Sequence, residues 1–250
     1  MTKKIFLSIA ASDSIGGAGI QADNRTAVLL GFYPVNVVTA VTAQNSSGVS
    51  DIQEVSEKML RAQFEAVLQD FKPDCVKIGL LPSSACAKTV AELIGSHSLE
   101  NVVLDPVLSA TMGGKINSEN IGKDIIDHFG DIVSLITPNL PESKKLTLEL
   151  GAPLQSVFKN VLIKGGHSEK NTSDDLLITN CGELIFEGER IATKNTHGSG
   201  CVLSSAIACY LAENYRMAEA VKLAKQFVQS QLLKNRDVSF GQSGYGPVIY

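Results

Sequence analysis

The chain has 250 residues, 44% hydrophobic and 19% charged, and its 22 basic and 26 acidic side chains give a formal net charge of −4. This size fits one large α/β domain, and we predict a single domain over residues 1–250. The small acidic excess and the absence of a Lys/Arg run argue against nucleic acid as a partner, and no apolar segment is long enough to predict a membrane span.

Five cysteines without CxxC spacing are typical of a reducing compartment rather than of a disulfide framework. The short apolar stretch near the N-terminus runs straight into a Gly-rich turn, so we interpret it as a first strand and not as a signal peptide. The expected location is cytoplasmic.

Short runs rich in Val, Ile and Leu alternate with longer amphipathic stretches along the chain. These runs are apolar on both faces, as buried parallel strands are. They lie at residues 5–11, 33–41, 75–81, 101–107, 132–139 and 160–166. Repeated strand-helix-strand units predict a mostly parallel sheet with helices on both faces.

Helical periodicity is clear between the second and third of these strands. Residues 57–71 follow Ser56 as an N-cap, place apolar side chains on one face, and end before Pro73. Two further helices are predicted near the C-terminus, at residues 199–214 and 216–235. They are expected to cover the sheet.

The pattern changes after residue 166. Residues 175–180 and 183–192 are two apolar runs joined by Cys181-Gly182, which predicts an antiparallel hairpin at one edge of the sheet. The predicted fold class is therefore α/β, with a mostly parallel central sheet and an antiparallel edge hairpin.

A Gly-rich turn between residues 13 and 23 connects the first strand to a helix. Gly17, Gly19 and Ala22 match a GxGxxA spacing, but several residues separate the turn from the strand and no acidic residue closes the second strand, so a dinucleotide fingerprint is not supported. An Asp at each end of the turn and the amide of Gln44 all follow adjacent strands. This placement favours a small polar ligand.

A second Gly-rich turn, residues 195–201, immediately precedes an apolar helix. Glycines and a helix start can direct several backbone N–H groups into one concavity, which makes an anion hole suited to a transferring phosphoryl group. Cys201 falls on the first helical turn, where the local field is expected to lower the thiol pKa. The alternative is an ordinary helix-entry turn with Cys201 as a small buried hydrophobe.

Acidic groups follow the fourth and fifth predicted strands. Asp105 and Glu142 are well placed for a hydrated Mg²⁺, although Glu142 also suits the first turn of a helix. Lys164, after the sixth strand, is a candidate for a nucleotide phosphate or a solvated edge residue. His197 lies in the second Gly-rich turn and is interpreted as structural.

Several motifs in one order resemble the hydroxymethylpyrimidine and phosphomethylpyrimidine kinases of thiamine synthesis, which belong to the ribokinase-like superfamily. They are GGAGIQAD (16–23), VTAQNSSGV (41–49), KIGLL (77–81), VVLDPV (102–107), LITPNLPE (135–142), IKGGH (163–167) and NTHGSGC (195–201). The resemblance covers nearly the whole chain. It implies a three-layer α/β/α fold, a homodimer, and the use of ATP with Mg²⁺.

The resemblance also implies a pyrimidine site. Gln44 matches the residue that hydrogen-bonds the aminopyrimidine, a role that an amide fills because it both donates and accepts. The backbone around Ala11, Ala18 and Val107 would frame the ring, and Asp23 is expected in the same site.

At the phosphate end, Asn139 and Glu142 match an Asn-x-x-Glu element that organises the phosphates and the hydrated Mg²⁺, which Glu142 would hold through water. Asp105 and Lys164 match positions at the nucleotide phosphates. These four residues are the expected ATP-binding set.

The anion hole of the family corresponds to Gly198, Ser199, Gly200 and Cys201, which are expected to be catalytic. Sugar kinases of the superfamily have an Asp base at the last position, whereas this branch has Cys. A neutral thiol would not repel the ionised monophosphate that is the acceptor in the second of the family's two reactions.

Three features depart from the family pattern. Ile15 replaces a common small residue and Leu80 a common Met, both next to the expected pyrimidine site. The segment between Glu142 and Val161 looks short, and we expect it to lack most of a helix and to leave one sheet face thinly covered.

Other functions remain open at this stage. A pyridoxal kinase of the same Cys-containing branch is the nearest, and Gln44 favours the pyrimidine. A ligand-sensing module without catalysis would not need the residues that match the phosphate end. A dehydrogenase conflicts with the context of the first Gly-rich turn.

Overall fold

The computed structural model describes residues 2–109, 117–166, 172–241 and 244–250. His167, the last residue of one matched motif, lies outside the described residues.

A single nine-stranded sheet runs through the described part of the chain. Its strands are β1 (Ile5–Ser12), β2 (Tyr33–Asn45), β3 (Gly48–Glu54), β4 (Cys75–Ile78), β5 (Val102–Leu104), β6 (Leu135–Ile136), β7 (Val161–Ile163), β8 (Asp175–Thr179) and β9 (Gly182–Phe186). Their order is β3-β2-β1-β4-β5-β6-β7-β8-β9. The pairs from β2 to β7 are parallel, and β3, β8 and β9 add antiparallel edges.

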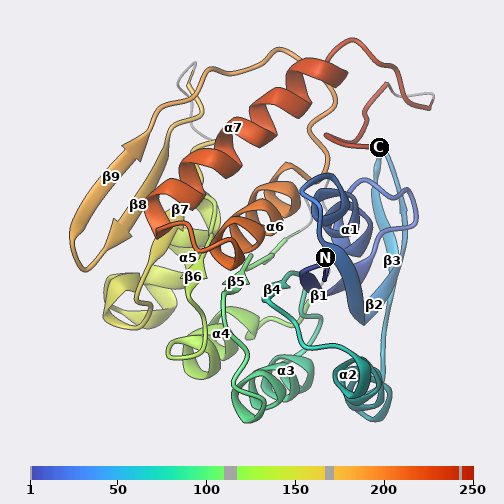
Figure 1. Ribbon diagram of the computed structural model, residues 1–250, viewed down its shortest axis with the longest axis vertical. Coiled ribbons are helices and arrows are strands. Elements are labelled where there is room, and N and C mark those ends of the chain that lie inside the picture. The colour runs from blue at the N-terminus through green and yellow to red at the C-terminus, as the bar shows by residue number, and fades with distance from the viewer. Residues whose placement is uncertain (1, 110–116, 167–171, 242–243) are drawn as a thin grey trace.

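Helices cover both faces of this sheet and make three layers (Figure 1). They are α1 (Gly19–Leu29), α2 (Glu57–Asp70), α3 (Ser84–Ser96), α4 (Ile121–Phe129), α5 (Leu140–Leu150), α6 (Ser199–Ala212) and α7 (Met217–Asn235), with a 3-10 turn at Leu154–Ser156. Helices α2 to α5 pack on one face, and α1, α6 and α7 pack on the other. The predicted three-layer α/β/α class is confirmed.

Alternating side chains of the central strands divide between two cores. In β1, Leu7 and Ile9 pack beneath α2 to α5, while Phe6 packs with α1, α6 and α7. The same alternation in β4 sends Val76 one way and Cys75 the other. Parallel strands buried on both faces need this continuous apolar sequence, which is why their positions were predictable.

All six predicted parallel strands and the predicted hairpin are present, each with somewhat different ends. The strand β3 was not predicted. Residues 48–54 are half-exposed or exposed, and polar residues separate Val49 from Ile52, so the segment has no apolar run. It forms because β2 continues to Asn45 and turns back, pairing Asn45 with Gly48.

The segment between Glu142 and Val161 was expected to lack most of a helix, and the structure shows that its first part is helical and its second part is not. Helix α5 spans Leu140–Leu150, begins on a capping box formed by Asn139 and Glu142, and ends at Gly151 with a left-handed φ of 69°. Only a 3-10 turn at Leu154–Ser156 lies between this helix and β7. Leu146 is fully buried in the core under this helix. The face is therefore covered.

None of the described helices has the length and apolar character needed to cross a membrane.

Candidate active site

The site lies where the parallel strands end. Asp13 follows β1, Asp105 follows β5, Asn139 follows β6 and Lys164 follows β7, while Gln44 lies near the end of β2. Because the carboxyl ends of parallel strands meet at one edge of a sheet, these segments share one side of the molecule. The predicted grouping of strand ends is thus built into the topology.

Asp13 holds the first Gly-rich turn in shape. One carboxylate oxygen accepts hydrogen bonds from the backbone N–H of Gly17 (2.9 Å) and Ala18 (2.8 Å), and the other accepts one from Ile15 (3.0 Å). Burial acts to raise the pKa of Asp13, but bonds from His197 and these amides outweigh it and leave the pKa below its usual range. The turn is therefore organised by a carboxylate that is ionised at neutral pH.

His197 joins this turn to the second one. Its Nε2 lies 2.8 Å from the Oδ2 of Asp13 and 3.3 Å from the Nε2 of Gln44. The other ring nitrogen, Nδ1, is buried and has no hydrogen-bond partner among the described residues. His197 was expected to be structural, and it is placed as the bridge between the two predicted halves of the site.

Two glycines make that bridge possible. A Cβ on Gly17 would lie 2.1 Å from the Cδ2 of His197. Gly198 has a left-handed φ of 78°, and a Cβ there would lie 1.9 Å from the carbonyl oxygen of Gly17. The two turns therefore touch through backbone, and neither position has room for a side chain.

Gln44 lies beside a small apolar patch. The hydroxyl of Ser14 bonds to both the N–H and the carbonyl oxygen of Gln44 at 2.8 Å, which ties the end of β2 to the first turn. Three buried residues form the patch with half-buried apolar neighbours. They are Ala11, Ala40 and Leu80, with Val49, Ile52 and Val107 packed against them. An amide beside an apolar surface suits a flat heteroaromatic ring.

Charged groups gather at the other end of the site. The Nζ of Lys164 lies 2.5 Å from the Oδ1 of Asp105. Burial alone would lower the pKa of Lys164, but Asp105 and Glu142 outweigh it, so the pKa is raised and the ammonium stays charged. Burial raises the pKa of Glu142, with Asp105 acting in the same direction and Lys164 opposing.

The start of α6 completes this end. A Cβ on Gly200 would lie 3.2 Å from the Nζ of Lys164 and 3.5 Å from the Oδ2 of Asp105. The first amides of a helix have no partner within the helix and carry a partial positive charge. Lys164 and the α6 N-terminus thus meet where an anion would be held.

The predicted lowering of the Cys201 pKa is wrong. Burial raises the pKa of this thiol to about 11, and the opposing effects of the Lys77 ammonium and a Gly19 backbone amide do not offset it. The helix terminus was the sequence signal, but loss of water around sulfur is the larger effect. Cys201 is therefore a neutral thiol near pH 7.

Asp23 was expected to contact the substrate, but in the structure its side chain does not reach open space. Its side chain is fully buried, and both oxygens lie 2.9 Å from the ammonium of Lys77. Sequence reasoning missed Lys77, although a lysine inside the apolar run CVKIGLL was a usable signal.

The carboxylates fit a hydrated Mg²⁺. Glu142 accepts one backbone hydrogen bond on each oxygen, from Asn139 (2.8 Å) and Leu108 (3.4 Å), and each oxygen keeps a lone pair for a further donor such as a metal-bound water. Within the described ranges, no group of three or more His, Cys, Asp or Glu side chains could hold a metal ion directly. A magnesium ion that keeps its waters needs few protein ligands.

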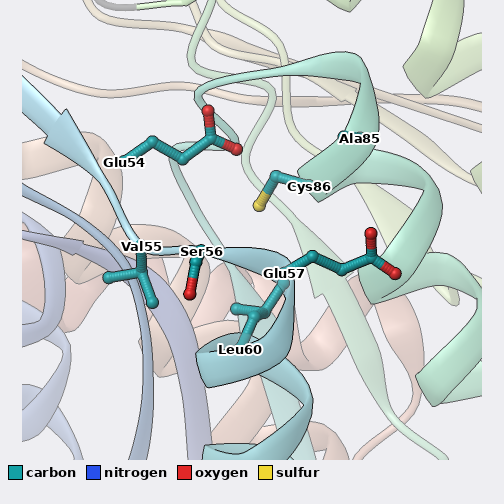
Figure 2. Close-up of a pocket in the computed structure, with 7 residues that line it drawn as sticks. All are labelled: Glu54, Val55, Ser56, Glu57, Leu60, Ala85 and Cys86. Carbon is teal, nitrogen blue, oxygen red and sulfur yellow. The ribbon is translucent and has the colours of Figure 1, made fainter.

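Two hollows lie apart from the residues named above. Figure 2 shows a cavity of about 240 Å³ at the N-termini of α2 and α3, lined by Glu54, Val55, Ser56, Glu57, Leu60, Ala85 and Cys86. It shares no residue with the candidate site. A wider hollow of about 1000 Å³ lies between the segment after β9 and α7, lined by Thr172, Asp174, Gln229 and residues 187–193.

The fold is that of the ribokinase-like kinases, and the candidate site places Lys164 and the start of α6 at one end and Gln44 at the other. The phosphomethylpyrimidine kinase family matches residues 13–249. The chain belongs to this family, whose members act in thiamine biosynthesis.

The chain is 39% identical over 254 residues to the hydroxymethylpyrimidine/phosphomethylpyrimidine kinase of Escherichia coli (strain K12), covering 97% of this chain and 95% of that protein. It is 36% identical to the probable thiamine biosynthetic bifunctional enzyme of Oryza sativa, of which it spans 46%. It thus matches one whole bacterial enzyme and about half of a longer plant one.

Two solved structures superpose on nearly the whole chain. The phosphomethylpyrimidine kinase of Clostridium difficile 630 has a TM-score of 0.79 and 32% identity, covering 92% of this chain and all of that one. An ADP complex of Bacillus subtilis pyridoxal kinase has a TM-score of 0.85 and 27% identity, covering 98% and 96%. The fold is common to both activities.

Proposed function

We propose that the chain transfers the γ-phosphoryl group of ATP to the hydroxymethyl oxygen of 4-amino-5-hydroxymethyl-2-methylpyrimidine and then phosphorylates the resulting monophosphate. The observation that carries this proposal is the bridge at His197, which sets an amide and an apolar patch on one side and an anion hole on the other. One small substrate can then span both.

At the pyrimidine end, Gln44 is assigned to the aminopyrimidine edge, with Ala11, Ala18 and Val107 framing the ring. The bond between Nε2 of His197 and Asp13 supports a defined orientation of the Gln44 amide, because a ring nitrogen that donates to Asp13 cannot also accept from Gln44. The Gln44 oxygen would then turn toward His197 and its NH₂ group toward the ligand.

At the phosphate end, the transferring group is assigned to the space between Lys164 and the first amides of α6, from Gly198 to Cys201. The rest of the nucleotide would extend toward the wide hollow beside α7. One residue that lines this hollow, Asp174, has its backbone against Gly165, the residue after Lys164.

Asp105, Asn139 and Glu142 would hold the hydrated Mg²⁺ through its waters and the phosphates. When bound, the ion would neutralise charge on the phosphates during transfer. In this arrangement Lys164 keeps its ammonium on the phosphoryl oxygens, and Asp105 keeps that ammonium in place.

The two steps place different demands on Cys201. In the first step the substrate oxygen bonds to the γ-phosphorus, the bond to ADP breaks, and the hydroxyl proton must leave; a thiolate is able to accept it. In the second step the acceptor is an ionised phosphate and no proton needs removal. A largely neutral thiol suits the second step because it does not repel this acceptor.

The experiment is to incubate the protein with the pyrimidine alcohol and Mg-ATP and to separate monophosphate, diphosphate and ADP. Sequential appearance of both phosphates is expected. Absence of ADP formation would contradict the proposal and favour a ligand-sensing role.

Pyridoxal kinase activity is the second candidate, because the pyridoxal kinase structure superposes as well as the pyrimidine kinase structure does. A competition assay with both alcohols separates the two. Preferential phosphorylation of pyridoxal, with no diphosphate product, would replace the first proposal. The homodimer and the cytoplasmic location stay predictions.

A further inference from the structure

Lys77 occupies an unusual place for a charged residue. It lies on the central strand β4 opposite Ser8 of β1, on the face covered by α1 and α6, and its side chain has no exposed surface. Asp23 of α1 holds the ammonium, and the hydroxyls of Ser8 (2.6 Å) and Ser205 (2.9 Å) each bond to one oxygen of Asp23. The four side chains form a closed polar cluster, here called the Lys77 cluster.

Helical spacing puts this cluster directly beneath the anion hole. Ser205 is four residues after Cys201 on α6, and Asp23 is four residues after Gly19 on α1, so each pair shares one helix face. Both helices begin at the site. The cluster therefore lies one helical turn below Gly19 of α1 and Cys201 of α6.

The ammonium also points toward the site along its own strand. A Cβ on Gly79 would lie 2.7 Å from the Nζ of Lys77, so the charged end of Lys77 rests against the backbone two residues nearer the carboxyl end of β4. The missing side chain at Gly79 leaves room for it.

A role in stability alone accounts poorly for the Lys77 cluster. Removing two charges from water is expensive, and replacing a buried ion pair by apolar groups of similar size is often neutral or stabilising. A positive charge held rigidly under a site for anions, in contrast, has an electrostatic use because surrounding water does not screen it.

We propose that Lys77 is a positioning residue for phosphoryl transfer, which supplies a fixed positive charge beneath Cys201 and the α6 N-terminus while Asp23 holds it in place. This role rests on the proposed function. The charge favours whichever anion forms above it, the Cys201 thiolate or the transferring phosphoryl group.

Other charged groups face Cys201 as well, and they define the expected signs. Besides Lys77 of β4, they are Asp23 of α1, Asp105 after β5 and Lys164 after β7. After burial, the Lys77 ammonium has the largest effect on the thiol pKa and lowers it, while the two carboxylates raise it. Removing Lys77 and removing Asp23 should therefore shift the thiol in opposite directions.

The test is the rate of iodoacetamide alkylation of Cys201 against pH, followed by mass spectrometry of its peptide in the full chain without nucleotide. Asp23→Asn should lower the apparent thiol pKa by about one unit and Lys77→Met should raise it by a similar amount. Shifts in the same direction, or none in folded variants, would overturn the proposal.

The double variant D23N/K77M keeps the test decisive if Lys77→Met does not fold, because it leaves no unpaired buried charge. Its thiol pKa should lie at or above that of the wild type and clearly above that of D23N. A double variant that still resembles D23N would overturn the role of Lys77.

Lys225→Met is a matched control. Lys225 and Asp175 form another buried pair, at 2.6 Å between α7 and β8. Its loss should leave Cys201 alkylation unchanged. A shift as large as that of the Lys77 variants would mean that the effect is a general response to lost packing.

Phosphorylation assays complete the design. D23N/K77M should lower kcat for both acceptors more than it changes either KM, and unchanged kcat would overturn the role in catalysis. The alkylation result does not depend on kinase activity. If the wild-type chain forms no ADP but the variants show thiol pKa shifts of the predicted sign, the proposed function is contradicted and the charge effect of Lys77 stands.

Discussion

Two lysine-aspartate pairs lie at the candidate active site, and their surroundings differ. Lys77 and Asp23 are both 0% exposed, with Asp23 further bonded to two hydroxyls. Lys164 and Asp105 are 13% and 4% exposed, and Lys164 faces the start of α6. The first pair is closed within the protein, whereas the second has an open side.

Because the two pairs differ in exposure, they are suited to different roles. A ligand can reach Lys164, so this ammonium is suited to bind a phosphoryl oxygen while Asp105 holds it in place. No ligand can reach Lys77, so its charge acts only through space. One site thus combines a charge that binds with a charge that sets the local potential.

The largest effect is expected on stability. Lys77→Met leaves Asp23 as an unpaired buried charge, which should lower the free energy of unfolding by about 3–5 kcal/mol. Urea denaturation measures it. Lys164→Met is the control and should cost clearly less, because Asp105 retains some access to water. Equal losses would mean that the two pairs do not differ as described.

The next effect is expected on catalysis. Lys164→Met removes the ammonium from the phosphoryl group, and kcat should fall about 10²–10³-fold, the range for loss of one oxyanion donor. Steady-state kinetics with both acceptors check this, with thermal unfolding to verify the fold. If only the KM for ATP rises, Lys164 binds the ground state and the transition state equally and does not act on kcat.

A smaller effect is expected at the bridge between the two turns. His197→Asn removes the ring that contacts Asp13 and Gln44, and the loss of one hydrogen bond to a charged group should raise the KM for the pyrimidine alcohol about tenfold. The KM for ATP serves as the internal control. A larger change in the KM for ATP would show that His197 orders the phosphate end instead.

The smallest effect at neutral pH is expected for Cys201→Ala. With the thiol pKa raised to about 11, little thiolate exists near pH 7. At pH values below this pKa, each increase of one pH unit raises the thiolate fraction about tenfold. The loss in alcohol phosphorylation should therefore be small at pH 7 and grow toward pH 9. Monophosphate phosphorylation should show no such growth, and parallel losses in both steps would refute a base role.

Much of the fold was predictable because buried parallel strands and amphipathic helices leave direct marks in the sequence. The six parallel strands and the edge hairpin follow from apolar runs, and α2 follows from its N-cap and its one apolar face. The strand β3 has no apolar run by which it could be predicted, and it forms because the chain turns back after β2.

The candidate site was predictable in composition but not in electrostatics. The motifs predicted Gln44, Asp105, Asn139 and Lys164 as site residues, because these positions lie at strand ends. The direction of the Cys201 pKa depends on burial, which no local pattern records.

Long-range contacts set the same limit elsewhere. The partner of Lys77 lies 54 positions away in the chain, and the bond between Asp13 and His197 spans 184 positions. Sequence spacing indicates helix faces and turns, but it does not show which distant segments meet.

The contact between the two Gly-rich turns also has a consequence for biosynthesis. Asp13 and Gly17 are made early, whereas His197 and Gly198 leave the ribosome only after most of the chain has been synthesised. Until then the first turn lacks its covering residue, and the Lys77 cluster lacks Ser205. A ribosome-bound chain stalled before residue 195 is therefore expected to have the β1–β4 core but no closed site.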